Sequence, residues 1–243
     1  MRARGRVARA ALPGALLALA LGAPVAVRAQ APAPAPTGVA ALAAAGRRAL
    51  AGAASVLSRL DAADNERLRR KQDAKYDPIF RAYSKRYFGP DFDYTWFVAQ
   101  SYAESQWNPR ARSRVGARGM MQLMPSTFRE IQSVRPEFRS IDDPRWNIAA
   151  GIMHDRYLFT LWPATGPDAI RESDRWAFAF ASYNAGEGTI GRARRTARAA
   201  QLDPATWSSL ERVAPTVERW RYPETVGYVH RIEAIHEALP QRH

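Results

Sequence analysis

Apolar side chains recur every three or four positions along most of the chain from residue 76 onward, which is the period of an α-helix. The first such stretch starts at Asp77-Pro78, because proline is tolerated in the first turn of a helix, and Gly89-Pro90 breaks it. We find no alternating pattern long enough to predict a β-strand. The pattern therefore predicts a mainly α domain.

A second helix is expected after Asp93, whose side chain can cap it, and Asn108-Pro109 ends it because the residue before a proline leaves the helical region. The run from Trp176 to Tyr183 is a strongly apolar helix that Gly186 and Gly188 should end. These signals place the helical domain at residues 75–240. Further helix starts are predicted at Thr127-x-x-Glu130, Asp143-Pro144, Ser208-x-x-Glu211 and Pro223.

The first 74 residues differ in composition from the predicted helical domain. Residues 1–29 combine a basic start, an apolar stretch from Ala10 to Val27 and small residues around Ala29, which predicts a signal peptide cleaved after Ala29. An uncleaved membrane anchor is the alternative, although the apolar stretch is short and interrupted by proline and glycine. Residues 30–74 begin with an Ala-Pro tract, expected to be extended, and continue as an Ala/Leu/Arg-rich linker with a peripheral helix.

Composition narrows the range of functions. The chain has no cysteine, which excludes disulfides, zinc-thiolate sites, cysteine nucleophiles and a cysteine-anchored lipoprotein. The formal net charge is +13, and the first 29 residues hold five Arg and no acid, so their removal leaves +8. Such a charge attracts polyanions. Export argues against nucleic acid and favours peptidoglycan, teichoic acid or an anionic membrane surface, while a solvated arginine-rich surface is the plain alternative.

One carboxylate stands out as a candidate for acid catalysis. Glu104 ends an apolar helical run, and partly apolar surroundings disfavour the charged form of a carboxyl group and raise its pKa. Taken alone, a single Glu at a helix end is usually a solvated surface residue. The residues that follow Glu104 favour a functional role for it, because a segment rich in Met and Gln and interrupted by glycines begins about a dozen residues later.

Several motifs in order resemble one known family. Glu104-Ser105-x-Trp107-Asn108-Pro109 and the segment from Ser113 to Pro125 resemble the first two signatures of the lytic transglycosylase SLT-domain family (glycoside hydrolase family 23, goose-lysozyme-like). Later stretches resemble the remaining signatures across roughly residues 76–240: Asp143-Pro144-x-x-Asn147-Ile148-x-x-Gly151, Ala181-Ser182-Tyr183-Asn184-Ala185-Gly186 and Glu224-Thr225-x-x-Tyr228-Val229.

The resemblance implies a lysozyme-like helical fold and cleavage of peptidoglycan glycan strands at the bond between N-acetylmuramic acid and N-acetylglucosamine. Glu104 would protonate the leaving oxygen while the substrate's own acetamido oxygen closes on the anomeric carbon. The ionised Glu104 would then act as base on the C6 hydroxyl, giving a 1,6-anhydromuramyl end without consuming water. Together with the predicted signal peptide, the resemblance implies an exported, periplasmic or envelope-associated protein.

The resemblance assigns supporting roles to six further residues. Ser113 would orient the N-acetyl group or the reacting sugar, Gln122 and Met124 would line the cleft, and Asn184 would meet the substrate. The tyrosines Tyr183 and Tyr228 would face the catalytic carboxyl group. From the residues alone, the tyrosines can equally be core aromatics with satisfied hydroxyls.

Other residues in these motifs have plainer interpretations. Met121 is expected to fill the core, while Met120 stays open. Glycines at positions 116, 119 and 186 are expected to serve tight turns. The four histidines show no ligand spacing, so neither a metal nor another cofactor is predicted.

Two alternatives remain beside a lytic transglycosylase. A hydrolase of the lysozyme type would need a further carboxylate to position water, and the places to look are Glu130, Asp142, Asp143 and Glu187. Glu187 stands where many members of the resembled family carry proline or another small residue, and a solvated loop position is its plainer interpretation. The other alternative is a module that opens the wall for a secretion or conjugation machine. No membrane span is expected after signal cleavage.

Overall fold

The computed structural model describes residues 75–239. The predicted signal peptide and linker, residues 1–74, and the domain end at residue 240 lie outside them. The helices are α3 (Asp77–Phe88), α4 (Thr95–Ser105), α5 (Pro125–Val134), α6 (Pro144–Leu161), α7 (Arg175–Ala185), α8 (Glu187–Ala199), α9 (Trp207–Val213) and α10 (Tyr222–Ala238), with short 3-10 helices η1 (Glu172–Asp174) and η2 (Ala214–Thr216). Within this range there is no strand, only isolated bridges from Arg118 to Arg112 and to Leu123, so the prediction of a mainly α fold is confirmed.

Several predicted helix starts agree with the structure. α3 begins at Asp77, and the Asp143 side chain caps α6 by accepting from the backbone N–H of Arg145 at 2.9 Å. The Asp93 carboxylate accepts from the Thr95 backbone N–H at 3.0 Å, in the first turn of α4. Each carboxylate satisfies a backbone donor that the helix itself leaves free.

Four local predictions are wrong. The capping box at Thr127 fails because α5 already starts at Pro125, with Met124 as an N-cap that makes no side-chain bond. Ser208 does not start α9, which begins at Trp207. Gly186 does end α7, but Gly188 lies inside a further helix, α8, which the apolar pattern did not predict. Glu187 is accordingly the first residue of α8 rather than a loop residue.

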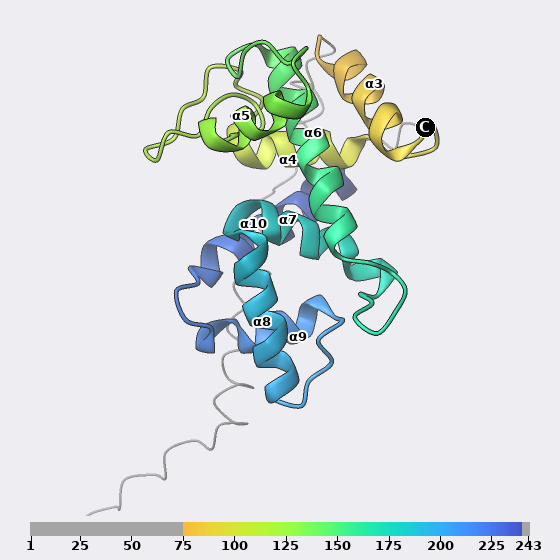
Figure 1. The fold of residues 1–243 in the computed structure, drawn as a ribbon, viewed down its shortest axis with the longest axis vertical. Helices are drawn as coiled ribbons and strands as arrows, with labels where there is room; N and C mark the ends of the chain where they lie inside the picture. The colour runs from red at the N-terminus through yellow and green to blue at the C-terminus, as the bar shows by residue number, and fades with distance from the viewer. Residues whose placement is uncertain (1–74, 240–243) are drawn as a thin grey trace, which may run out of the picture. The chain divides into compact units, whose positions relative to one another are not determined.

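Helix α7 forms the centre of the described part. Every residue from Ala177 to Ser182 is buried, as expected of a helix that is apolar all round. It packs against α6, α8 and α10, while α10 also packs along α4 and α3 packs on α6. Figure 1 shows α3 and α5 at one end, α8 and α9 at the other, and α6 running between them. This packing brings the end of α4, the end of α7 and the middle of α10 together.

The segment between α4 and α5 is fixed to α6 by two close approaches. The buried Asn147 amide accepts from the Met121 backbone N–H at 2.8 Å and donates to the carbonyls of Arg118 at 2.9 Å and Ile141 at 3.0 Å. Gly151 leaves room for the Met121 side chain, which a Cβ there would meet at 2.7 Å. Met120 and Met121 are 1% and 0% exposed, so both fill the core.

None of the helices between residues 75 and 239 has the length and apolar character that a bilayer-crossing segment needs.

Glycine 119 provides a direct test of this anchoring. Its φ of 77° is left-handed, and a Cβ would overlap the Asn147 amide, so Gly119→Ala should lower the free energy of unfolding by about 3 kcal/mol, from backbone strain and displacement of a buried hydrogen-bonded group. The matched control is Gly116→Ala, where φ is 95° but a Cβ meets nothing within 4 Å. Urea unfolding of both variants measures the difference, and equal losses would contradict the role of Asn147.

Candidate active site

Glu104 lies in the last turn of α4, and the chain beyond it is tightly held. Gln106 and Trp107 are both left-handed, with φ of 54° and 59°, so the helix stops abruptly after Ser105. The Trp107 indole N–H donates to the Val98 carbonyl at 2.9 Å, and the Ser105 hydroxyl donates to the Met120 carbonyl at 2.9 Å. These contacts fix the turn from which the Glu104 side chain extends.

The Glu104 carboxyl group is partly buried and hydrogen-bonded to α10. The Tyr228 hydroxyl donates to Glu104 Oε1 at 2.6 Å, across 124 positions of sequence. Burial raises the pKa of Glu104 to about 7, while the Tyr228 hydrogen bond and the charge of Arg231 lower it by a smaller amount. Near neutral pH the group therefore exists in both protonation states, which suits a residue that must give a proton and take one back.

Tyr183 lies close to this carboxyl group but bonds elsewhere. Its hydroxyl donates to the Met121 carbonyl at 2.7 Å, which ties α7 to the methionine-rich segment. Burial, with smaller contributions from Asp155 and Glu104, raises the pKa of Tyr183 well above its ordinary value. Burial has the same effect on the pKa of Tyr228. Both phenols thus keep their protons and serve as donors.

The other predicted residues fall into two groups. Asn184 lies in the last turn of α7 beside Tyr183, and its Oδ1 accepts from the Thr225 hydroxyl at 2.9 Å. Ser113 and Gln122 shape their own segment: the Ser113 hydroxyl accepts from the Ala117 backbone N–H at 3.0 Å, and the Gln122 amide donates to the Gly119 carbonyl at 2.8 Å. Met124 is 39% exposed at the start of α5. The structure thus brings Glu104, Tyr183 and Tyr228 together and leaves Ser113, Gln122 and Met124 without a hydrogen bond to them.

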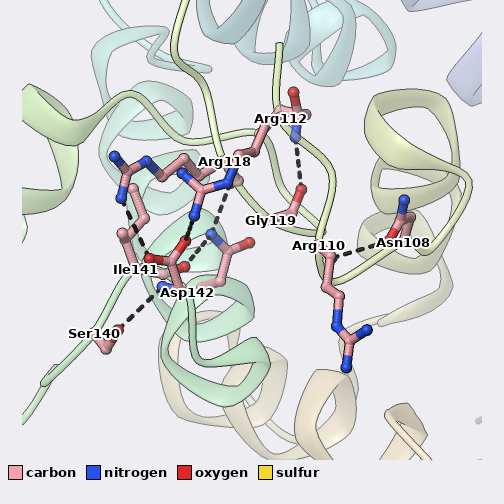
Figure 2. Close-up of polar contacts among 10 residues, drawn as sticks. Asn108, Arg110, Arg112, Arg118, Gly119, Ser140, Ile141 and Asp142 are labelled. Atoms are coloured by element: carbon pink, nitrogen blue, oxygen red, sulfur yellow. Dashed lines mark hydrogen bonds and ion pairs between the residues drawn. The ribbon is translucent and has the colours of Figure 1, made fainter.

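The segment that carries Ser113 is held at its base by a surface ion-pair cluster. Figure 2 shows the Asp142 carboxylate between Arg112 and Arg118, at 3.2 and 3.3 Å, while the Arg110 side chain points away. Exposed pairs of this kind contribute little to stability, and here they link the segment to the loop before α6. Asp142 is consequently engaged in these ion pairs.

The sequence reasoning missed a buried acid behind Glu104. Asp155 on α6 is fully buried, and its Oδ1 accepts from the Gln100 amide at 3.1 Å. Gln100 is also fully buried, one helical turn before Glu104. Burial raises the pKa of Asp155 well above its ordinary value. One signal was available: Asp155 continues the apolar stripe of Ile148, Ile152 and Phe159, where an acid is unexpected.

Protonation of Asp155 would resolve two unsatisfied atoms. Asp155 Oδ2 and Gln100 Oε1 are both buried without a hydrogen-bond partner. With a proton on Oδ2, Asp155 can donate a hydrogen bond to the Gln100 side-chain carbonyl. The carboxylic acid and the amide would then be joined by two hydrogen bonds, this one and the bond from the Gln100 amide to Asp155 Oδ1. The neutral pair would add no charge behind Glu104.

Among the described residues, no group of three or more His, Cys, Asp or Glu side chains is arranged to hold a metal ion.

Comparison with known proteins shows that the chain is similar to lytic transglycosylases. A family model described as the transglycosylase SLT domain matches residues 84–205, inside the predicted domain of 75–240, whose ends remain predictions. The membrane-bound lytic murein transglycosylase F of Shewanella loihica is 34% identical over 185 residues, which cover 74% of this chain and 36% of that protein. The protein of that name from Shewanella oneidensis is 35% identical over 161 residues, covering 65% and 32%. The chain thus spans about a third of the length of these relatives.

Solved structures show the same fold. The crystal structure of the 70 kDa soluble lytic transglycosylase from Escherichia coli matches with a TM-score of 0.52 and 24% identity, covering 81% of this chain and 29% of that one. The complex of a 70 kDa soluble lytic transglycosylase with bulgecin A matches with a TM-score of 0.51 and 24% identity, covering 83% and 30%. The predicted lysozyme-like helical fold is therefore confirmed.

The pKa of Glu104 predicts how its replacement changes stability with pH. The folded state holds this proton more tightly than the unfolded chain, so burial of the carboxyl group costs least below about pH 4.5 and most above about pH 7. Glu104→Gln, which stays neutral, should therefore gain stability relative to the parent as pH rises, by at most about 3 kcal/mol. Urea unfolding at about pH 5 and about pH 8 measures the gain, and a difference that does not change with pH would contradict the shifted pKa.

Substitutions of Asp155 test whether this buried carboxyl group is neutral in the folded protein. Asn at this position keeps one donor and one acceptor, so Asp155→Asn should change the free energy of unfolding by less than about 1 kcal/mol. Asp155→Leu has no polar partner for the buried Gln100 amide and should cost about 2–4 kcal/mol. Thermal and urea unfolding give both values. A large loss in the Asn variant would mean that a charged Asp155 stabilises the fold.

Proposed function

Because the chain belongs to the transglycosylase SLT domain family, we propose that it is a lytic transglycosylase acting on peptidoglycan glycan strands. The proposed reaction cleaves the β-1,4 bond between N-acetylmuramic acid and N-acetylglucosamine without consuming water. The observation that carries it is the Glu104 carboxyl group, partly buried, with a pKa of about 7 and a hydrogen bond of 2.6 Å from Tyr228.

In the first step Glu104 acts as the acid. Its proton goes to the glycosidic oxygen as the bond from that oxygen to the anomeric carbon breaks, and the N-acetylglucosamine side leaves as an alcohol. The acetamido oxygen of the muramyl sugar bonds to the anomeric carbon, and the developing positive charge passes to the oxazolinium ring that this forms, opposite the Glu104 carboxylate. This nucleophile belongs to the substrate, so its effective concentration is high and the protein needs no second carboxylate for this step.

In the second step the same group acts as the base. The Glu104 carboxylate takes the proton of the muramyl C6 hydroxyl while O6 bonds to the anomeric carbon and the acetamido oxygen departs. The product is a 1,6-anhydromuramyl end, and Glu104 regains its proton. Between the steps the Tyr228 hydroxyl stabilises the carboxylate, because a hydrogen bond to a charged acceptor is stronger than one to a neutral acceptor.

A hydrolase would need another carboxylate to position water. The sequence offers four candidates for this carboxylate, and the structure gives the surroundings of each. Asp142 is engaged with two arginines, and Asp143 caps α6. Glu130 and Glu187 are exposed on α5 and at the start of α8. Asp155, the acid behind Glu104, is fully buried and cannot reach solvent water. The engagement of Asp142 and Asp143 and the burial of Asp155 favour the non-hydrolytic route.

The proposed setting is the cell envelope. The basic and apolar residues 1–29 favour export, and the names of the relatives from Shewanella describe membrane-bound proteins. We propose a periplasmic or envelope-associated enzyme whose partner is peptidoglycan rather than nucleic acid. A role in opening the wall for a secretion or conjugation machine remains a further proposal.

Product analysis tests this function. Purified protein incubated with sacculi should release fragments with 1,6-anhydromuramyl ends, each one water lighter than the reducing ends that a hydrolase makes. Glu104→Gln should lower turnover at least about 1,000-fold, because general acid and base catalysis each contribute about 100-fold or more. Mass spectrometry of the fragments measures both.

Glu130→Gln, an exposed carboxylate on α5, is the matched control and should keep parental turnover. Reducing muramyl ends would identify a hydrolase instead. Near-normal turnover in Glu104→Gln would remove that residue from the mechanism.

A further inference from the structure

Three aromatic rings from three different helices form a stack. The His236 imidazole on α10 lies on the Trp96 indole of α4, with ring centroids 3.7 Å apart and planes 7° from parallel. Trp96 also stacks on Trp176 of α7, at 6.2 Å and 10°. These three helices are the ones that carry the carboxyl group and the two tyrosines of the active site. The ring stack of His236, Trp96 and Trp176 therefore joins all three.

The ring stack and the active site lie at opposite ends of the contact between α4 and α10. Glu104 follows Trp96 by eight residues on α4, and Tyr228 precedes His236 by eight residues on α10. At 1.5 Å per residue, each separation is about 12 Å. Because the separations are equal and the helices run in opposite directions, both contacts form at one relative position of the two helices. A displacement of α10 along α4 would carry the Tyr228 hydroxyl away from Glu104 and weaken a hydrogen bond of 2.6 Å.

Asp93 fastens His236 to the start of α4. Asp93 Oδ1 accepts from the Thr95 backbone N–H at 3.0 Å, and its Oδ2 lies 2.7 Å from His236 Nε2. Burial alone would raise the pKa of Asp93, but the hydrogen bonds from Thr95 and His236 outweigh it and hold this pKa below its ordinary value. A carboxylate can only accept, so the imidazole N–H donates. The side chains of His236 and Asp93 are 13% and 22% exposed, so water competes little for this bond.

We propose that His236 is a positioning residue, which holds α10 in the place that keeps the Tyr228 hydroxyl on the Glu104 carboxyl group. It acts through the hydrogen bond to Asp93 and through the ring stack. The inference rests on the proposed function, because it concerns the acid-base group of that reaction. One hydrogen bond leaves a helix free to turn about that point, whereas a second contact about 12 Å away restrains it. Apolar packing between the helices is not directional, while a hydrogen bond and a ring stack are.

Removal of the His236 side chain tests the proposal. His236→Ala should lower kcat for the release of anhydromuramyl ends about tenfold, the size expected when a hydrogen bond to a charged group is weakened. KM should not change, because the bond between Tyr228 and Glu104 lies within the protein. The titration midpoint of the Glu104 carboxyl group, followed by its 13C resonance, should rise by about 1 pH unit. In Tyr228→Phe, which already lacks the bond, His236→Ala should change neither value further.

A second variant and a control separate positioning from a general loss of stability. His236→Phe keeps a ring on Trp96 but loses the hydrogen bond to Asp93, so it should show smaller changes of the same sign, even if His236→Ala does not fold. Ile190→Val is the matched control for lost packing. It removes a methylene group from a buried side chain of α8, which contributes no ring to the stack, and should keep the parental kcat and midpoint.

A parental Glu104 midpoint in folded His236→Ala, or in His236→Phe, would overturn the positioning role and leave the proposed function standing. An equal further loss of kcat in the Tyr228→Phe background would do the same, because the effect would then not pass through Tyr228. A raised midpoint in Ile190→Val would assign the change to general loosening instead. If the parent releases no anhydromuramyl ends, the proposed function falls, while the Glu104 midpoint still decides whether His236 positions Tyr228.

Discussion

The desolvation of one carboxyl group at the contact between α4 and α10 is the constraint on which the rest of the structure depends. Burial alone would hold Glu104 protonated, and full exposure would leave it ionised near neutral pH. Here burial raises its pKa to about 7, while the Tyr228 hydroxyl, at 2.6 Å, partly offsets that shift. Both protonation states are therefore populated under physiological conditions. A mechanism with a single acid-base residue requires this balance, since the proton lost in one step returns in the next.

The surrounding contacts keep that balance by fixing the geometry rather than by adding charge. The carbonyls of Met120 and Met121 accept from Ser105 and Tyr183, so the methionine-rich segment is bound to both α4 and α7. Asn147 closes the same segment onto α6 with three hydrogen bonds. Polar atoms buried in this way are costly to leave unpaired, which makes the arrangement specific. The motif from Asn147 to Gly151 resembles a helix signature of the SLT family. Its structural role is to hold the methionine-rich segment beside Glu104.

Much of this could be predicted from the sequence, because the strong signals are local. Apolar spacing, Asp143-Pro144 and Gly186 give the helices and several of their ends, and the ordered motifs give the family. Helix α8 was missed since its buried face consists of Ile190, Ala193 and Ala197, small side chains that an apolar pattern registers weakly among arginines. The hydrogen bonds between Gln100 and Asp155 and between Thr225 and Asn184 join positions far apart in sequence. Such contacts depend on how helices pack, and spacing along the chain does not encode them.

The pKa of Glu104 itself is the quantity that tests this account most directly. With glutamate labelled by 13C at the side-chain carboxyl, the resonance that disappears in Glu104→Gln identifies the group, and its chemical shift can be followed as pH is changed. The account predicts a midpoint of about 7 in the parent protein and a higher one in Tyr228→Phe, because the hydrogen bond that favours the carboxylate is lost. A midpoint near the ordinary value of 4.5, unchanged by removal of the Tyr228 hydroxyl, would contradict it.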